Sequence, residues 1–514
     1  MDSSSLLVIL GIFAMLLVLS LDKMRPGFTI FSVAIFFMAV GIITPKELVE
    51  GFSNKEMITV AMLFLIGEGV RQSGSLGYIM RYILPQKRGR IGWMMAQILP
   101  VITMISTVLN NTAVVIIFAP MIKRWADKIG VPATKFLIPL SYATIFGGVC
   151  TLVGTSTNMV VNGMMIEAGY RGFSMFEIGK VGVVIAVVGI IYLIVFGNML
   201  LPGGDKEAEI VDDDTVEVIL AARYPGVGKS LRQFNFQRHY GVKVIGIVKN
   251  GNRIDKNIER ITLVEGDTLL IKGDDTFIRT WSDSSAFHIV SYGELDQEPS
   301  EDQVAMTTPQ RWLGMSLLIF LIGGCALGEF ISKRVEGVAP FDIFSMAAVT
   351  MVVMAIAKLF PTKRYTKYIS WDILIAIASA FAISKAMSNS GINEMLASWI
   401  INTSSNWGNY GVLALLFLVT MLLTEFITNN AAVAISFPIA NALGQQLGID
   451  PMPLFVGICI AASASFSSPI GYQTNLIVQG VGGYKFKDYL RVGIWLNLLT
   501  FIISIILIPL IWEF

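Results

Sequence analysis

Two uncharged polar clusters interrupt apolar stretches of the chain and carry its clearest chemical signal. Asn110–Thr112 lies in STVLNNTAVVIIFAP (106–120), and Thr428–Asn430 lies in TEFITNNAAVAISFPIA (424–440). Amide and hydroxyl oxygens, with nearby freed carbonyls, can hold a dehydrated cation such as Na⁺. Their N–H groups, with the positive end of the helix that follows, can meet an anion. The clusters therefore predict ion binding that needs no charged side chain.

A second pair of polar stretches follows the first pair at matched spacing. GGVCTLVGTSTNMVV (147–161) aligns with SFSSPIGYQTNLIVQ (465–479), which places Gly154 on Gly471 and Asn158 on Asn475. Two motifs at matched spacing in both halves indicate an internal repeat. A single Asn in such a segment is typical of a helix-to-helix hydrogen bond, whereas the doubled pattern favours a binding site.

These motifs must be positioned by membrane-spanning helices. The chain has 514 residues, of which 54% are hydrophobic and only 15% are charged, against roughly 25% charged in soluble proteins. Apolar runs such as 6–21, 181–201 and 498–512 approach or exceed the roughly 20 residues that a span needs. We expect an all-α polytopic membrane protein with about 11 spans, the first run being a span rather than a signal peptide.

Composition also excludes several function classes. The net charge of +1 argues against a nucleic-acid partner. The two histidines, His239 and His288, lie in the polar centre of the chain, which excludes a membrane catalyst that uses histidine. The three cysteines are far apart in apolar surroundings and predict neither a disulfide framework nor a metal site. We expect no enzyme.

Three regions follow from the polarity of the chain: a membrane block (1–203), a polar insert (204–310) and a second membrane block (311–514). Within the insert, VKVIGIVKNGNRI predicts a β-hairpin, GDTLLIKGDD predicts another strand, and GKSLRQF can open a helix. The acidic stretches at its two ends resemble linkers. The insert is therefore expected to be a small α/β domain.

Basic loops set the expected orientation in the plasma membrane. The segments 81–90, 361–368 and 485–491 are rich in Lys and Arg, which predicts that they are cytoplasmic. The N-terminus and C-terminus are then outside and the insert is in the cytoplasm. Because the two polar clusters enter from opposite faces, the repeats are expected to be inverted.

At this point the chain resembles the divalent anion:sodium symporters of the ion-transporter superfamily, which carry paired Ser-Asn-Thr motifs at the tips of two re-entrant hairpins. The resemblance covers both membrane blocks. It implies an elevator motion within a homodimer, co-transport of Na⁺ and a small divalent anion, and two Na⁺ sites. It places those sites at Ser106, Asn110, Asn111 and Gly154, and at Thr424, Thr428, Asn429 and Gly471. The expected substrate-binding residues are Asn110, Asn111, Thr112, Thr155, Ser156, Thr428, Asn429, Asn430, Tyr472 and Gln473.

Departures from the family pattern bear on the substrate. Asn110 stands where the family has serine, Asn430 where it has threonine, and Tyr472 where it has a small residue. The Pro-Pro pair is replaced by Ser156-Thr157 in one half and Gln473-Thr474 in the other. The additional donors favour a compact oxyanion such as sulfate. A dicarboxylate symporter remains an alternative, as do a channel and an anion sensor.

Ionisable residues are few in the membrane blocks. Glu425, next to the second cluster, is a functional candidate because it lies at membrane depth. It would be essential in a further alternative, an H⁺-coupled anion exporter. Glu68 and Arg71, three residues apart, are expected to form an ion pair on one helix face.

The insert resembles an RCK C-terminal (TrkA-C type) domain over Tyr224–Ile254 and Leu263–Asp275. Such domains dimerise and can bind regulatory nucleotides. The resemblance implies either a regulatory nucleotide site or a purely structural module, and it strengthens the expectation of an inorganic-anion substrate.

Overall fold

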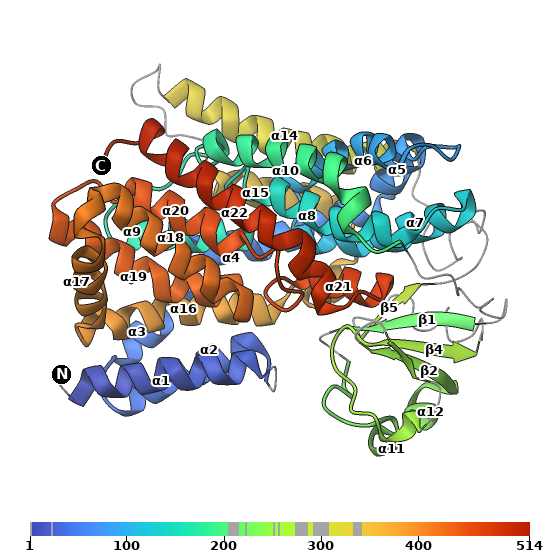
Figure 1. The fold of residues 1–514 in the computed structure, drawn as a ribbon, viewed down its shortest axis with the longest axis horizontal. Helices are drawn as coiled ribbons and strands as arrows, with labels where there is room; N and C mark the ends of the chain where they lie inside the picture. The colour runs from blue at the N-terminus through green and yellow to red at the C-terminus, as the bar shows by residue number, and fades with distance from the viewer. Residues whose placement is uncertain are drawn as a thin grey trace.

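The computed structural model describes residues 3–21, 24–203, 215–221, 224–249, 252–254, 257–272, 286–290, 308–332 and 342–514. Its described part is a bundle of helices with a small β-sheet beside one end (Figure 1). The expected linkers, apart from Gly203, lie outside the described residues.

The helices before the sheet run from the N-terminus to residue 200. Their bounds are α1 Ser3–Ser20, α2 Pro26–Ala39, α3 Pro45–Glu50, η1 Gly51–Ser53, α4 Lys55–Gln72, α5 Ser75–Ile83, α6 Ile91–Ser106, α7 Asn111–Ile129, η2 Ala133–Lys135, α8 Leu137–Gly148, α9 Ser156–Glu167 and α10 Gly179–Leu200.

The helices after the sheet repeat much of this order. Their bounds are α14 Thr308–Ser332, α15 Ile343–Ile356, η4 Thr362–Tyr368, α16 Trp371–Asn389, α17 Ile392–Ser404, η5 Ser405–Trp407, α18 Gly408–Phe426, α19 Asn429–Leu447, α20 Met452–Ser463, α21 Gln473–Gly482 and α22 Phe486–Ile511.

Several helices have the length and polarity of membrane spans. Among the described residues, five helical stretches are long and apolar enough to cross a bilayer, and five further apolar helices have 10–17 residues. On α10 the exposed side chains Val183, Val187, Ile191 and Val195 follow one another at four-residue spacing. An exposed stripe of that kind is the surface a helix presents to lipid. The chain is thus a multi-pass membrane protein.

Both halves contain a helical hairpin followed by a broken helix. In the first half, α6 and α7 form the hairpin, and α8 and α9 are separated by a break at 149–155. In the second half, α18 and α19 form the hairpin, and α20 and α21 are separated by a break at 464–472. The four polar segments expected from the sequence are therefore the four places where these helices stop and restart.

One hydrophobic core joins the two halves. Buried residues from α1 to α22 form one continuous cluster. The long helices α10 and α22 pack against each other, and the Tyr192 hydroxyl of α10 donates to the Val492 carbonyl of α22 at 3.0 Å. The breaks therefore lie inside a packed protein, where their polar backbone is shielded from lipid.

The insert contains a five-stranded sheet of order β3-β2-β4-β1-β5, with every neighbouring pair antiparallel. The described bounds are β1 Thr215–Leu220, α11 Leu231–Phe234, α12 Phe236–Tyr240, β2 Val244–Lys249, β3 Asn252–Ile254, η3 Ile258–Arg260, β4 Thr268–Lys272 and β5 Phe287–Val290. The predicted hairpin (β2–β3), strand (β4) and helix (α11) are confirmed. Its likeness to an RCK domain stays a prediction.

The sheet lies directly against α21 (Figure 1). The Thr268 hydroxyl of β4 donates to the Gly480 carbonyl of α21 at 3.1 Å. A Cβ added at Gly480 would lie 2.5 Å from the Gly266 carbonyl oxygen, so glycine is needed for this approach. Ile219 of β1 packs in the core cluster of the helical bundle rather than in the insert's own core. Helix α21 is thus the described helix on which the insert is seated.

Gly493 allows α22 to pack tightly over the break between α20 and α21. A Cβ added there would lie 1.9 Å from the Phe466 carbonyl oxygen. We expect Gly493→Ala to lower the free energy of unfolding by about 1–3 kcal/mol, because a backbone atom must move to admit the methyl group. Thermal unfolding in detergent would measure it.

Gly77→Ala is the matched control, because Gly77 is also helical and its added Cβ meets no atom within 4 Å. Equal melting temperatures for the two variants would contradict the packing role of Gly493.

Candidate functional site

The tips of both hairpins and both helix breaks surround one cavity, which encloses about 660 Å³ of empty space including its opening to solvent. Most of the residues expected to bind substrate or Na⁺ line it. They are Asn110, Asn111, Thr112, Gly154, Thr155, Ser156, Thr428, Asn429, Asn430, Gly471, Tyr472 and Gln473. Ser106, Thr424 and Glu425 lie behind this lining. The structure thus brings together residues more than 350 positions apart.

At the first tip, the Asn111 side chain is surrounded by oxygen atoms. With its amide oriented so that nitrogen faces acceptors, Asn111 donates to the Ser106 hydroxyl at 2.7 Å and to the Thr144 carbonyl at 2.9 Å. It also donates to the Gly154 carbonyl at 3.2 Å. The Gly154 carbonyl is available because the helix is broken between α8 and α9. The tip of the hairpin and the break therefore meet at one amide group.

The second tip has the same arrangement. Asn429 donates to the Thr424 hydroxyl at 2.8 Å, the Gly471 carbonyl at 3.0 Å and the Ala462 carbonyl at 3.3 Å. Each of these atoms comes from the position equivalent to its counterpart around Asn111 when the two halves are aligned on their polar clusters. The two halves therefore build matching oxygen-lined sites.

These oxygen sets are suited to a cation. Each set contains two backbone carbonyls and one hydroxyl, all of which can act as ligands, and the asparagine presents either its nitrogen or its oxygen to them. When the amide nitrogen faces the oxygen set, its N–H groups donate hydrogen bonds to these oxygens. With the oxygen inward, the amide adds a fourth oxygen beside the other three, and hard cations prefer oxygen ligands.

Two further asparagines hold the breaks in place. Asn158 donates to the Gly148 carbonyl at 3.2 Å and the Thr151 carbonyl at 2.9 Å. Asn475 donates to the carbonyls of Ser465 at 2.9 Å and Ser468 at 3.0 Å. In both cases the acceptors lie ten and seven residues earlier in the chain. One side chain thus satisfies two carbonyls that the helix break leaves without amide partners.

Four helices of the hairpins and broken helices begin at the cavity. Asn110 caps α7 by accepting from the Thr112 amide at 3.0 Å, and α9, α19 and α21 begin at Ser156, Asn429 and Gln473. The first amides of a helix have no partner within it, and the helix dipole places partial positive charge there. The lining residues that the structure describes include one carboxylate, Asp372, and no Lys, Arg or His. Four converging helix N-termini therefore favour an anion without any basic side chain.

Tyr472 connects the two halves at the centre of the site. Its hydroxyl lies 2.7 Å from the Asn111 amide and 3.3 Å from the Thr155 hydroxyl, and it also interacts with Asn429. Thr155 is the equivalent residue of the first half. The larger tyrosine thus crosses the cavity and contacts both tip asparagines.

A second, weaker link joins the halves at the rim. The Ser156 hydroxyl donates to Asn430 at 3.3 Å. The Thr428 hydroxyl, which lines the cavity, has no hydrogen-bond partner among the described residues. Thr428 therefore offers an uncommitted donor to a molecule in the cavity.

Glu425 holds the backbone of the second break. Its carboxylate accepts from the Asn497 amide at 2.5 Å and from the Ser467 backbone amide at 3.0 Å. It does not line the cavity. These contacts fit a positioning role for Glu425 at the hairpin.

Sequence reasoning missed the opposite wall of the cavity. This wall consists of Pro26 at the start of α2 and Asp372, Ile373 and Ala376 in the first turns of α16. The Gly27 amide donates to the Asp372 carboxylate at 3.1 Å, which fastens the two helix starts together. The available signal in the sequence was Asp372, an acidic residue at the start of an apolar run.

Comparisons with known proteins agree with this architecture. The model of the CitMHS family, described as citrate transporters, matches residues 14–448 and 330–514. An uncharacterized transporter of Synechocystis is 29% identical over 93% of this chain and 92% of its own length. Sodium/sulfate cotransporter 1 of Chlamydomonas reinhardtii is 22% identical over 94% of this chain and 87% of its own.

Among solved structures, the YdaH transporter of Alcanivorax borkumensis has a similar fold. The TM-score is 0.54 at 12% identity, over 99% of this chain and 98% of that one. This likeness concerns the fold alone.

Removal of the amides that hold the breaks provides a test of this geometry. We expect Asn158→Ala and Asn475→Ala each to lower the free energy of unfolding by about 1–3 kcal/mol, because two buried carbonyls lose their donor. Thermal unfolding in detergent would measure this. Asn402→Ala, at an exposed position, is the control, and losses no larger than its own would contradict the role of Asn158 and Asn475.

Proposed function

Because the chain belongs to the CitMHS family of citrate transporters, we propose that it is a Na⁺-coupled secondary active transporter of a small divalent anion, with sulfate as the preferred substrate. It acts as a symporter and not as an enzyme. The observation that carries this proposal is the pair of matching oxygen sets around Asn111 and Asn429, placed beside a cavity at which four helices begin.

The oxygen sets support Na⁺ as the co-transported ion. They comprise the neutral side chains of Ser106 and Asn111 with the Gly154 carbonyl, and their equivalents in the second half. Neutral oxygen ligands favour a monovalent cation, since a divalent one usually recruits carboxylates. The sodium/sulfate cotransporter of Chlamydomonas, a relative over most of the chain, is consistent with this ion.

The donors around the cavity support a compact oxyanion. The helix N-termini and the Thr428 hydroxyl present uncharged donors from several directions. A tetrahedral dianion such as sulfate accepts from all sides, whereas an elongated dicarboxylate concentrates its charge at two ends. The Tyr472 side chain narrows the centre of the cavity and so favours the shorter ligand.

Coupling follows from the contacts of the tip asparagines. When Na⁺ enters an oxygen set, Asn111 turns its oxygen inward and its nitrogen toward the Tyr472 hydroxyl. The same change at Asn429 is transmitted through the same tyrosine. Ion binding thereby fixes the hairpin tips and the donors of the first turns of α7 and α19 before the anion binds. Each ligand then raises the affinity for the other, because linkage is reciprocal.

Alternating access would move the hairpins and broken helices against the wall made by α2 and α16. The wall and the site meet at the cavity, so a relative displacement opens one side and closes the other. We propose inverted repeats, an elevator motion and a homodimer, in line with the family resemblance. The RCK-like insert is proposed as a regulatory module that takes a nucleotide.

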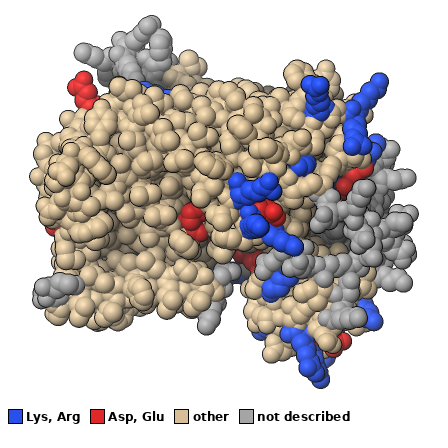
Figure 2. All heavy atoms as spheres, in the orientation of Figure 1, with Lys and Arg blue, Asp and Glu red and all other residues tan. Residues whose placement is uncertain are grey.

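The distribution of charge supports the proposed orientation. On the face that Figure 2 shows, Lys and Arg gather near the end where the sheet meets the helices, and the rest of the bundle is almost free of them. Basic loops remain preferentially on the cytoplasmic side. We therefore propose that the sheet lies in the cytoplasm and that both chain termini lie outside.

Two alternatives differ in substrate or driving ion. The family description as citrate transporters favours a carboxylate as the second candidate anion. An H⁺-coupled anion exporter would instead use Glu425, whose contacts with Asn497 and Ser467 would have to change during transport. Glu425→Gln should leave Na⁺-driven uptake largely intact under the main proposal and abolish transport under this alternative.

Na⁺-driven uptake tests the proposal directly. Purified protein in proteoliposomes should accumulate labelled sulfate only with an inward Na⁺ gradient. Asn111→Ala and Asn429→Ala should each reduce this uptake by at least about 100-fold, because the loss of one buried ligand and its hydrogen bonds costs roughly 3 kcal/mol or more. The exposed Asn402→Ala variant is the control. Uptake without Na⁺, or normal uptake in both tip variants, would refute the proposal.

Tyr472→Phe tests the coupling through the tyrosine. The variant keeps the ring and removes the hydroxyl that contacts both asparagines, so Na⁺ should still raise the melting temperature. Sulfate should raise the melting temperature further in the presence of Na⁺, but higher sulfate concentrations should be needed. The apparent affinity for sulfate should fall about tenfold, which corresponds to about 1.4 kcal/mol. An unchanged affinity for sulfate would show that the hydroxyl takes no part in coupling.

A further inference from the structure

A buried carboxylate lies outside the cavity, at the start of α4. Glu56 is in the first turn of α4, where its backbone amide donates to the capping Asn54 side chain at 2.9 Å. Only 4% of Glu56 is exposed. Its Oε1 accepts from the Asn162 amide of α9 at 3.0 Å, and its Oε2 has no hydrogen-bond partner among the described residues. Glu56 thus has one neutral partner and one unsatisfied oxygen.

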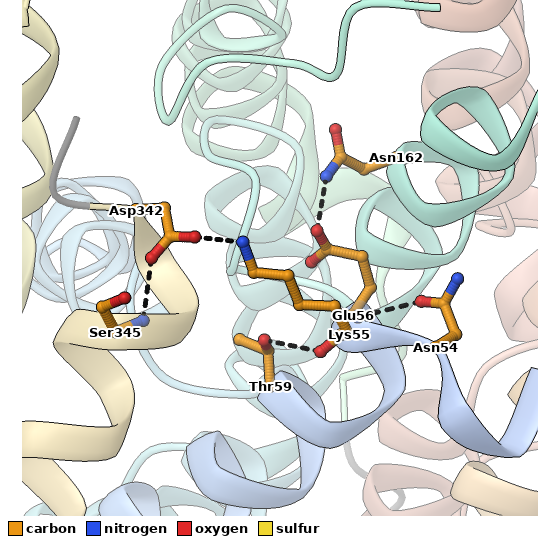
Figure 3. A network of polar contacts seen from close by, with 7 residues as sticks. All are labelled: Asn54, Lys55, Glu56, Thr59, Asn162, Asp342 and Ser345. Carbon is orange, nitrogen blue, oxygen red and sulfur yellow. Dashed lines mark hydrogen bonds and ion pairs between the residues drawn. The ribbon is translucent and has the colours of Figure 1, made fainter. Parts of the chain in front are cut away.

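The neighbouring ammonium group is already paired with another residue. The Lys55 side chain extends to Asp342 at the start of α15, while the Glu56 carboxylate turns toward Asn162 (Figure 3). Asp342 also accepts from the Ser345 amide at 2.9 Å. Lys55 and Asp342 are the charged groups that act on Glu56, and they act in opposite directions.

The other helices packed around Glu56 present uncharged groups. Helix α9 contributes Asn162 and Gly163, and α16 contributes Phe381. A Cβ added at Gly163 would lie 3.0 Å from Phe381 and 3.3 Å from the Glu56 side chain, so the three helices are in close contact. These helices therefore place no cation beside the Glu56 carboxylate. Burial of an ionised carboxylate without a cation costs several kcal/mol.

Helix α9 links this carboxylate to the transport site. It begins at Ser156 in the cavity, six residues before Asn162, which corresponds to about 9 Å along the helix axis. Asn162 also accepts from the Phe173 backbone amide at 2.6 Å, and this second hydrogen bond fixes its side chain on α9. The hydrogen bond between Glu56 and Asn162 therefore joins α4, α14 and α15 to a helix that carries the site.

We propose that the Glu56 carboxyl is a proton-binding site and that its ionised form holds α9 against α4 through Asn162. While Glu56 is ionised, moving α9 away removes its single donor and leaves a bare charge in an apolar contact. When a proton binds Oε2, the neutral carboxyl can lose Asn162 at much lower cost. Protonation therefore releases α9.

Helix α3, which ends six residues before Glu56, lies at the end of the bundle away from the sheet (Figure 1). Lys55 and Asp342, whose side chains are 51% and 35% exposed, lie beside Glu56. Protons can reach it from that side, which is the outside of the membrane in the proposed orientation. The effect of this proton on transport rests on the proposed function, whereas the proton site itself does not depend on it.

Infrared spectroscopy can detect the proton without any transport. pH-difference spectra of the purified protein should contain the C=O band of a protonated carboxyl that disappears in Glu56→Gln. The band should remain in Glu68→Gln, a variant of the same helix whose carboxylate pairs with Arg71 at 2.6 Å. In Asn162→Ala the band should persist to higher pH, because the ionised form loses its hydrogen bond. Identical spectra for the wild type and Glu56→Gln would overturn the proposal.

Transport measurements then test the release of α9. At a fixed Na⁺ gradient, uptake by the wild type should rise as the external medium is acidified. Glu56→Gln mimics the neutral carboxyl, so its rate of uptake should be the same at each pH. The rate of uptake by Glu68→Gln should retain the wild-type pH dependence. A pH dependence that survives in Glu56→Gln would overturn the release of α9 by protonation. Absence of all uptake, with the infrared band present, would refute the transport function and leave the proton site standing.

Discussion

The rest of the structure depends on one constraint: a backbone that leaves the helix inside a bilayer must find its hydrogen-bond partners within the protein. Asn158 and Asn475 meet this need by each donating to two carbonyls of a break. Once the breaks are held, the carbonyls of Gly154 and Gly471 become free to face the tip asparagines. The same interruptions create the helix starts that surround the cavity.

The two halves are alike where they contact a tip asparagine and different where they face the centre of the cavity. The surroundings of Asn111 and Asn429 correspond position by position, as expected if both bind the same ion. Tyr472 and Thr155 occupy equivalent positions but differ greatly in size. Under the proposed function, an anion at the centre of the cavity would meet different side chains from the two halves, and these residues would set the selectivity.

The sequence was informative where the signal was local. Polar residues within apolar runs predicted the hairpin tips and breaks, and alternating residues around an Asn-Gly turn predicted the β2–β3 hairpin. The predicted ion pair of Glu68 and Arg71 is present at 2.6 Å. The Thr144 and Ala462 carbonyls could not be predicted, because any residue type supplies a carbonyl. The Asp372 wall was equally hidden, since only the folded chain brings α16 to the tips of the hairpins.

The seating of the sheet on α21 has a mechanical consequence. Gly266 and Gly480 meet with no side chain between them, so the two surfaces cannot slide past each other without a steric clash. A small rotation of α21 would therefore turn the sheet with it. Strand β3 lies two strands beyond β4, about 10 Å farther from this contact. Because arc length grows with radius, an angular change at Gln473 would be magnified at that outer edge.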